Sequence, residues 1–226
     1  MPSDTADRPI KVLVVDDDFL AREAITAMLR HHVDLEVVGT AAGGVEAIAL
    51  ARATRPDVVL MDVQMPGMDG VETTRALLGQ QDTDVVAMTS LATSETVWRM
   101  IDAGAYGYVL KDDAPADLAA AVRTVARGDA FLSPRYTREL LERSASDAGA
   151  DARRTAAELF ATLTDRERDA ARLVAAGAGD GEIARAMHVA LSTAKAHVQQ
   201  ARNKLGARNR TQIAVLVERA GQTPSA

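Results

Sequence analysis

Cysteine is absent from the chain, and its absence excludes disulfide bonds, thiolate metal sites and cysteine nucleophiles. No run of about 18 apolar residues occurs without a charge, so no segment is suited to crossing a bilayer. The first nine residues are mostly polar, unlike a secretory signal. The 226 residues are 47% apolar, which is ordinary for a folded protein of one or two domains. We therefore expect a cytoplasmic globular protein.

Acidic and basic residues are unevenly distributed along the chain. Residues 1–131 carry 11 Lys and Arg against 21 Asp and Glu, whereas residues 155–226 carry 10 against 7. The stretch from Ile183 to Val217 has no acid and six basic residues: Arg185, Lys195, Arg202, Lys204, Arg208 and Arg210. This distribution favours two domains, the second binding a polyanion. A solvated basic helix face explains the charge alone equally well.

Short apolar runs alternate with segments of helical periodicity in the first part of the chain. The runs are Lys11–Val15, Glu36–Thr40, Val58–Met61, Val85–Met88 and Tyr106–Leu110. The helical segments are Phe19–Leu29, Val45–Ala53, Val71–Leu78, Ser94–Ala103 and Ala114–Ala126. Fivefold alternation predicts a doubly wound α/β fold with a five-stranded parallel sheet and right-handed crossovers.

The composition changes after this α/β part. Gly128 is a natural stop for its last helix, and residues 143–154 (RSASDAGADARR) are small, polar and aperiodic, as in a flexible linker. From Leu163 onward the pattern is helical, with no strand-like run. We expect one domain over residues 1–131, a linker over 132–158 that is helical in part, and an all-helical domain over 159–226.

Reactive side chains follow four of the predicted strands. Asp16 and Asp17 follow the first, Asp62 ends the third, Thr89 follows the fourth and Lys111 the fifth. The carboxyl ends of parallel strands build the ligand site of such a sheet. Clustered carboxylates repel each other unless a cation neutralises them, and hard oxygen ligands suit Mg²⁺. An ionised aspartate can attack phosphorus to form an acyl phosphate, whose oxygens Lys111 and Thr89 would stabilise.

The motifs VLVVDDD, VVLMDVQMPGMDG, AMTS and GAYGYVLKD resemble the receiver domain of two-component response regulators over roughly the first 130 residues. The resemblance implies a CheY-like fold in which a sensor histidine kinase phosphorylates Asp62. It also implies that Asp16, Asp17, Asp62 and the backbone carbonyl of Gln64 bind Mg²⁺.

Further roles follow from the same resemblance. Thr89 and Lys111 would contact the phosphoryl group, and Thr89 and Tyr108 would form the switch. Tyr108 could instead be a core aromatic residue that does not move. Asp18 is expected to cap the helix beginning near Phe19, and Asp69-Gly70 to form a turn or helix start.

The chain after Leu163 shows the layout of a helix-turn-helix domain. Thr164 and Glu167 form the Thr-x-x-Glu pattern of a capping box, which predicts a helix start at Thr164. A short helix is expected around Gly181–Met187, followed by a tight turn. Ser192 or its neighbour is expected to cap a longer basic helix that runs to about Leu205. In such domains the second helix of the motif enters the major groove.

The motifs LTDRERD, EIARAM, STAKAHV and NKLGARNRTQ resemble the LuxR-type output domain of NarL/FixJ response regulators over about 60 residues. The resemblance implies binding to double-stranded promoter DNA. Base edges would face Lys195, Ala196 and Gln199, and phosphates would be held by Thr193, Arg202, Lys204 and Arg208. Ala194, Ala201 and Arg202 stand where the family often has larger aliphatic residues. Replacing a core leucine by alanine removes burial worth about 2–5 kcal/mol. The domain is therefore either only modestly stable, or its helices pack closer together.

Taken together, these motifs predict a DNA-binding transcription regulator, not an enzyme, controlled by phosphorylation. Phosphorylation would draw Thr89 inward with Tyr108 following, and either free the output domain, promote a homodimer, or both. Three alternatives are a regulator active without phosphate, a Mg²⁺-dependent phosphohydrolase, and an interaction module without nucleic acid. The phosphohydrolase lacks support because Asp62-Val63-Gln64 carries no second acid.

Overall fold

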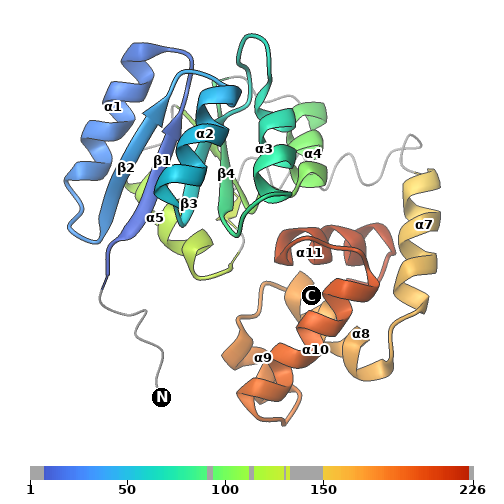
Figure 1. Ribbon diagram of the computed structural model, residues 1–226. Helices are drawn as coiled ribbons and strands as arrows, with labels where there is room; N and C mark the ends of the chain where they lie inside the picture. The colour runs from blue at the N-terminus through green and yellow to red at the C-terminus, as the bar shows by residue number, and fades with distance from the viewer. Residues whose placement is uncertain (1–7, 91–93, 112–114, 130, 133–149, 224–226) are drawn as a thin grey trace. The chain divides into compact units, whose positions relative to one another are not determined.

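A computed structural model of the chain describes residues 8–90, 94–111, 115–129, 131–132 and 150–223. The chain divides into two compact units, Met1–Ser133 and Pro134–Ala226 (Figure 1). No helix in the described ranges has the length and apolar character needed to span a membrane.

The first unit is built on a parallel sheet with the strand order β2-β1-β3-β4-β5-β6. The strands are β1 (Ile10–Val15), β2 (Leu35–Ala41), β3 (Val58–Asp62), β4 (Asp84–Thr89), β5 (Gly107–Leu110) and β6 (Phe131–Leu132). The first five confirm the predicted five-stranded parallel sheet, each within one residue at either end. The two-residue β6 lies beside β5 and was not predicted, because two residues are too few to show periodicity.

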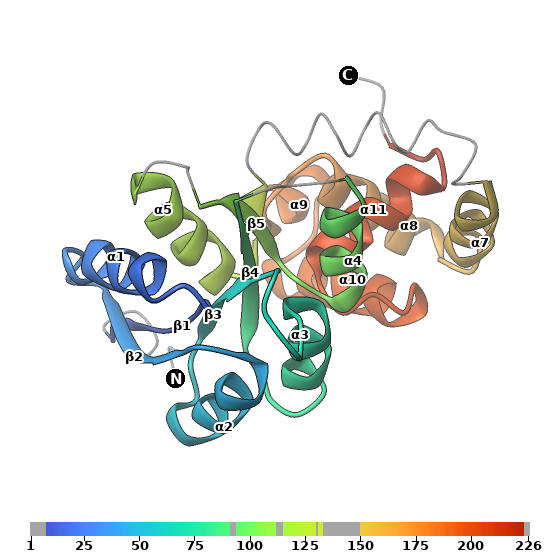
Figure 2. The same ribbon diagram turned by 90° about the horizontal axis from the view of Figure 1, so that it is seen from above.

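Helices cover both faces of the sheet. They are α1 (Phe19–Arg30), α2 (Gly44–Thr54), α3 (Gly70–Leu78), α4 (Ser94–Ala103) and α5 (Pro115–Ala126). Figure 2 shows α1 and α5 on one face and α2, α3 and α4 on the other. The buried parts of β1, β3 and β4 therefore contact apolar side chains on both sides, which explains their near-continuous apolar sequences.

Two predicted helix starts of this unit are confirmed. The Asp18 side chain accepts hydrogen bonds from the backbone N–H groups of Leu20 and Ala21 and so caps α1. Asp69 forms a reciprocal capping box with Glu72 at the start of α3. The Asp18 cap lies in the short loop between β1 and α1, which also carries Asp16 and Asp17.

The second unit is entirely helical in its described residues. It contains α7 (Ala150–Ala161), α8 (Asp165–Ala175), α9 (Asp180–Ala186), α10 (Leu191–Lys204) and α11 (Arg210–Arg219). The expected capping box of Thr164 and Glu167 starts α8. The core joins Phe160 and Leu163 to apolar residues of the later helices, including Ile183 and Ile213.

The linker expected to be helical in part contains the beginning of α7, whose residues 150–154 extend a helix stabilised by burial of Ala156 and Phe160; residues 143–149 lie outside the described residues. One local expectation for the second unit was wrong, since Ser192 does not cap α10. The N-cap is Ala190, which has no capping side chain, because the turn closed by the left-handed His188 (φ 54°) brings the chain into the helix earlier.

Candidate phosphoryl-transfer site and nucleic-acid interface

Strand register brings the predicted site residues to one edge of the sheet. Asp62 at the end of β3 pairs with Met88 of β4, and the backbone N–H of Lys111 donates to the carbonyl of Thr89 at 2.9 Å. Asp16 directly follows β1, the strand on the other side of β3. Side chains from four separate parts of the sequence therefore meet at the carboxyl ends of the central strands.

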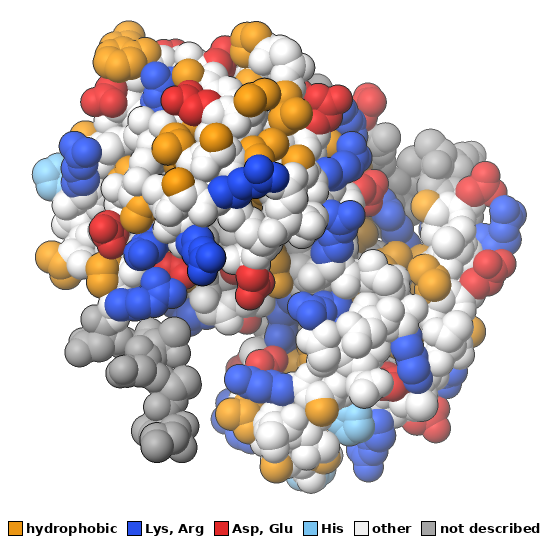
Figure 3. Space-filling model, in the orientation of Figure 1, with side chains coloured by type: hydrophobic (Ala, Val, Ile, Leu, Met, Phe, Trp, Pro, Cys, Tyr) orange, Lys and Arg blue, Asp and Glu red, His pale blue; other side chains and the backbone are white. Residues whose placement is uncertain are grey.

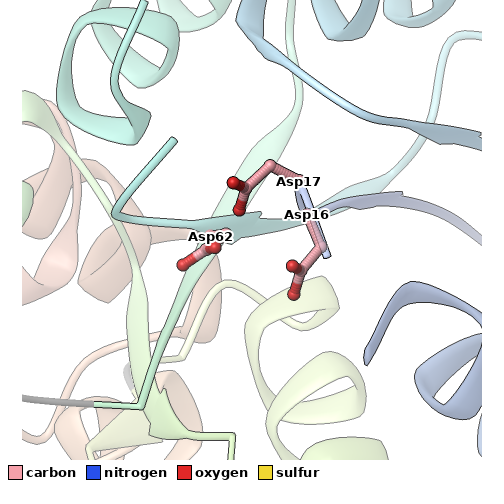
Figure 4. Close-up of side chains that lie close together, drawn as sticks. All are labelled: Asp16, Asp17 and Asp62. Atoms are coloured by element: carbon pink, nitrogen blue, oxygen red, sulfur yellow. The ribbon is translucent and has the colours of Figure 1, made fainter. Parts of the chain in front are cut away.

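Three carboxylates converge at this edge. Asp16, Asp17 and Asp62 each place one carboxylate oxygen within 4.8 Å of the others, and Figure 4 shows the three side chains grouped at the strand ends. Asp16 and Asp62 are buried, with 0% and 4% of their surface exposed, whereas Asp17 faces solvent. A cluster of hard oxygen donors open on one side fits a divalent cation that keeps part of its water shell.

Lys111 neutralises the buried part of this cluster. Its ammonium lies 2.7 Å from Asp16 Oδ2 and 2.8 Å from Asp62 Oδ2. Burial alone would lower the pKa of Lys111, but its polar contacts with Asp16 and Asp62 and their negative charges together outweigh burial and raise that pKa. Burial raises the pKa of the Asp62 carboxyl, and the Lys111 hydrogen bond opposes the shift. The lysine therefore remains charged and favours the ionised form of Asp62.

The remaining predicted receiver residues lie around this centre. The backbone N–H of Gln64 donates to Asp62 Oδ1 at 3.3 Å, which places its peptide group beside the carboxylate. Thr89 ends β4, next to β3, and is buried. Tyr108 lies within β5, in register with Ala87, and its side chain is fully buried.

One residue that contacts the pocket was not predicted. The Arg22 guanidinium donates to the backbone carbonyl of Asp16 at 2.5 Å and lies over the ring of Phe19, 5.6 Å from its centroid. In the sequence, Arg22 is an ordinary polar position on a helix, so its context carries no signal for this contact. Its bond fixes the main chain that carries Asp16 and Asp17.

The predicted DNA-contacting residues are concentrated on α10. Thr193, Lys195, Ala196 and Gln199 are exposed, and Arg202 is partly exposed. The opposite face of α10 is buried and carries Ala194 and Ala201, both 0% exposed. The helix therefore presents the predicted residues away from its own core, as an element that enters a groove must.

Basic side chains of this unit lie among acidic ones. Figure 3 shows both kinds on its visible face. Arg208 is exposed after α10, but Lys204 pairs with Glu167 at 2.7 Å and Arg210 pairs with Asp180 at 2.9 Å. Both acids precede the acid-free stretch, so sequence composition alone did not reveal these pairs.

Comparison with known proteins gives a consistent result for both units. The family model described as "Response regulator receiver domain" matches residues 12–123. The family model described as "Bacterial regulatory proteins, luxR family" matches residues 161–217. The two matches include every predicted site residue of the receiver and of the helix-turn-helix segment.

Individual proteins resemble the chain over nearly its whole length. The response regulator protein VraR of Staphylococcus aureus is 38% identical over 207 residues, which is 91% of this chain and 95% of VraR. The crystal structure of the response regulator ChrA of a heme-sensing two-component system is 28% identical, with a TM-score of 0.53, and the match covers 95% of this chain and 98% of ChrA. A LuxR-family response regulator from Aurantimonas sp. SI85-9A1 is 31% identical, with a TM-score of 0.58, over 61% of this chain and 99% of that one.

Proposed function

The chain belongs to the two-component response regulators of the NarL/LuxR family, with a receiver domain and a LuxR-type DNA-binding output domain, and from this we propose that Mg²⁺-dependent phosphorylation of Asp62 by a sensor histidine kinase switches its binding to promoter DNA. The family consists of transcription regulators, not enzymes, which disfavours the phosphohydrolase alternative. We place this activity in the cytoplasm, with a receiver over residues 1–131, a linker over 132–158 and an output domain over 159–226.

The observation that carries the proposal is the placement of Lys111 between Asp16 and Asp62. A lysine placed between two buried carboxylates supplies the positive charge that offsets their mutual repulsion and favours the ionised form of Asp62. Asp62 is then available as a nucleophile, and the ammonium already lies where negative charge develops on a phosphoryl oxygen. A phosphate-independent regulator has no need of this arrangement.

Each pocket residue has a role in the proposed phosphoryl transfer. Asp62 attacks the phosphorus of the donor and becomes an acyl phosphate, and the donor leaves with the bonding electron pair. Asp16, Asp17, Asp62 and the Gln64 carbonyl would hold Mg²⁺, which supplies positive charge to the phosphoryl oxygens. Lys111 and Thr89 bind two of those oxygens. Movement of Thr89 toward them vacates space into which Tyr108 follows.

The output domain is proposed to bind DNA through α10. Lys195, Ala196 and Gln199 would face base edges, and phosphates would be held by Thr193, Arg202 and Arg208. Ala196 is small and Gln199 is neutral, so few direct base contacts are expected.

We further propose that phosphorylated copies pair through α1. Phe19 and Leu20 are 61% and 75% exposed in the first turn of this helix. Later residues of the same helix line a cavity of about 90 Å³; its lining includes Ala21, Ala24, Ile25 and Met28 of α1, Leu110 of β5 and Leu118 of α5. Protruding apolar side chains and an apolar cavity on one helix are complementary between two copies related by a twofold axis. Lys111 also lines the cavity, which links it to the phosphorylation site.

The proposal is tested by measuring DNA affinity at several salt concentrations, with and without acetyl phosphate and Mg²⁺. We expect acetyl phosphate to add one phosphoryl group, detected by mass spectrometry, and to tighten DNA binding about tenfold or more. Asp62→Asn should abolish both effects. Regulated DNA binding that persists in Asp62→Asn contradicts the switch, and DNA binding that is weak and insensitive to salt favours an interaction module instead.

A further inference from the structure

Lys204, in the last turn of α10, forms an ion pair within the helical unit. The Lys204 ammonium lies 2.7 Å from Glu167 Oε2, and Glu167 belongs to the first turn of α8. The Glu167 side chain is 8% exposed, whereas that of Lys204 is 37% exposed. The contact therefore joins the end of α10 to the beginning of α8, across 37 residues of sequence.

Glu167 has a second task that fixes its position. The same Oε2 atom accepts a hydrogen bond from the backbone N–H of Thr164 at 2.7 Å, which completes the capping box of α8. The Lys204 hydrogen bond lowers the pKa of Glu167, against the opposing effect of burial. Leaving a buried carboxylate without its cation costs free energy of folding. The Lys204 ammonium is therefore held against the capped first turn of α8.

We propose that Lys204 is a positioning residue which, with Glu167, fixes the end of the recognition helix on α8 and does not contact DNA. This inference rests on the proposed DNA binding through α10, and it replaces the phosphate contact expected for Lys204. A helix anchored at its last turn presents Lys195 and Gln199 at a defined rotation, and small errors in that rotation misplace groups that must meet base edges.

A second basic residue of the same stretch is used in a similar way. Arg210, the first residue of α11, pairs with Asp180 at 2.9 Å and donates to the carbonyl of Ala178. Its side chain is 13% exposed. Two of the six basic residues in the acid-free stretch therefore hold helices together, and fewer positive charges face the DNA than the composition suggests.

The test compares single and paired substitutions in the full-length chain, treated with acetyl phosphate and Mg²⁺, on a DNA site selected from random duplexes. We expect Lys204→Met to weaken binding about tenfold at every salt concentration, with the slope against log salt unchanged. Glu167→Gln with Lys204→Met should recover most of the affinity, because glutamine preserves the capping box and no charge is left unpaired. Lys204→Arg should bind like the wild type.

Arg202→Met is the matched control on the same helix. If Arg202 contacts a phosphate, its removal should reduce the magnitude of the slope of log affinity against log salt by about 0.9. If Lys204→Met gives this reduced slope and the double variant is no tighter, Lys204 contacts phosphate and the proposal is overturned. Unchanged DNA affinity in Lys204→Met also overturns it.

Amide hydrogen exchange without DNA separates this inference from the proposed function. Lys204→Met should speed exchange in the first turn of α8 and the last turn of α10, and the double variant should restore protection. If the wild type binds no DNA, the proposed function and the positioning role both fail, and the exchange result still decides whether the Glu167–Lys204 tie exists. Unchanged exchange in Lys204→Met shows that the Glu167–Lys204 ion pair does not hold the ends of α8 and α10 together.

Discussion

Asp84 occupies the end of the sheet opposite the phosphoryl-transfer site. It begins β4, and its backbone N–H donates to the carbonyl of Asp57 at 3.0 Å. Burial, together with the charges of Asp82 and Asp57, raises the pKa of Asp84 to about 7. Arg8 neutralises Asp57 from its exposed side at 2.7 Å. Asp84 thus contributes nothing to the proposed chemistry and titrates near physiological pH.

The raised pKa of Asp84 predicts a pH-dependent stability. The folded chain keeps this proton at pH values at which the unfolded chain, with a pKa near 3.8, has lost it. The associated stability is therefore complete below pH 3.8 and is lost as pH rises through 7. We expect Asp84→Asn to be more stable than the wild type at pH 8, by roughly 1–4 kcal/mol, and nearly equal to it at pH 4.

Chemical denaturation followed by the fluorescence of Trp98, the single tryptophan, measures this difference. Glu23→Gln is the control, because Glu23 is exposed on α1, and it should show no comparable pH dependence. A stability difference for Asp84→Asn that is the same at pH 4 and pH 8 contradicts the assignment.

Gly70 holds the phosphoacceptor strand and α3 close together. A Cβ atom there would lie 2.1 Å from the backbone oxygen of Asp62 and 2.8 Å from Cα of Val63. We expect Gly70→Ala to destabilise the receiver by about 1–3 kcal/mol and to slow phosphorylation by acetyl phosphate at least tenfold. Gly43→Ala is the matched control, since a Cβ at Gly43 meets no atom within 4 Å. Normal phosphorylation of Gly70→Ala, measured by mass spectrometry, contradicts this prediction.

At the scale of elements, α10 is unusual for the small residues on its buried face. Ala194 and Ala201 are both 0% exposed and belong to the same apolar core as Phe160 and Ile183. Their full burial shows that no water-sized space adjoins them, and both a closely packed core and a core with smaller voids meet this condition.

Ala201→Leu tests which alternative holds. In a closely packed core the added atoms have no space, and we expect a loss of about 1–3 kcal/mol in the stability of the helical unit. Ala186→Leu, at an exposed position of α9, should change stability little. Hydrogen exchange of the α10 amides measures both variants. A gain in protection for Ala201→Leu indicates instead a cavity that leucine fills.

At the scale of the whole molecule, the proposed dimer depends on one exposed face of α1. We expect acetyl phosphate and Mg²⁺ to raise the sedimentation coefficient of the wild type to that of a dimer. Leu20→Asp should prevent this, because a charge cannot enter an apolar cavity without a partner. Val33→Asp is the control, since Val33 is 98% exposed just after the same helix. If Leu20→Asp dimerises as the wild type does, the pairing face lies elsewhere.

Local pattern determined much of this protein. The alternation of apolar runs with helical periodicity predicted all five principal strands and the first five helices, because each pattern is set by residues that are neighbours in sequence. The order of Asp16, Asp62, Thr89 and Lys111 along those strands predicted that they would meet, because parallel strands end at one edge. The capping residues Asp18 and Thr164 were equally local.

The tertiary structure alone decided which charged groups pair when they are distant in sequence. The Lys111 bridge between two carboxylates and the Glu167–Lys204 ion pair each join residues whose separation has no local signature. The rise in the pKa of Asp84 depends on burial, and burial depends on everything packed around a site. Packing also decided that residues 150–154 are helical, because a polar segment becomes ordered where its few apolar side chains find a core.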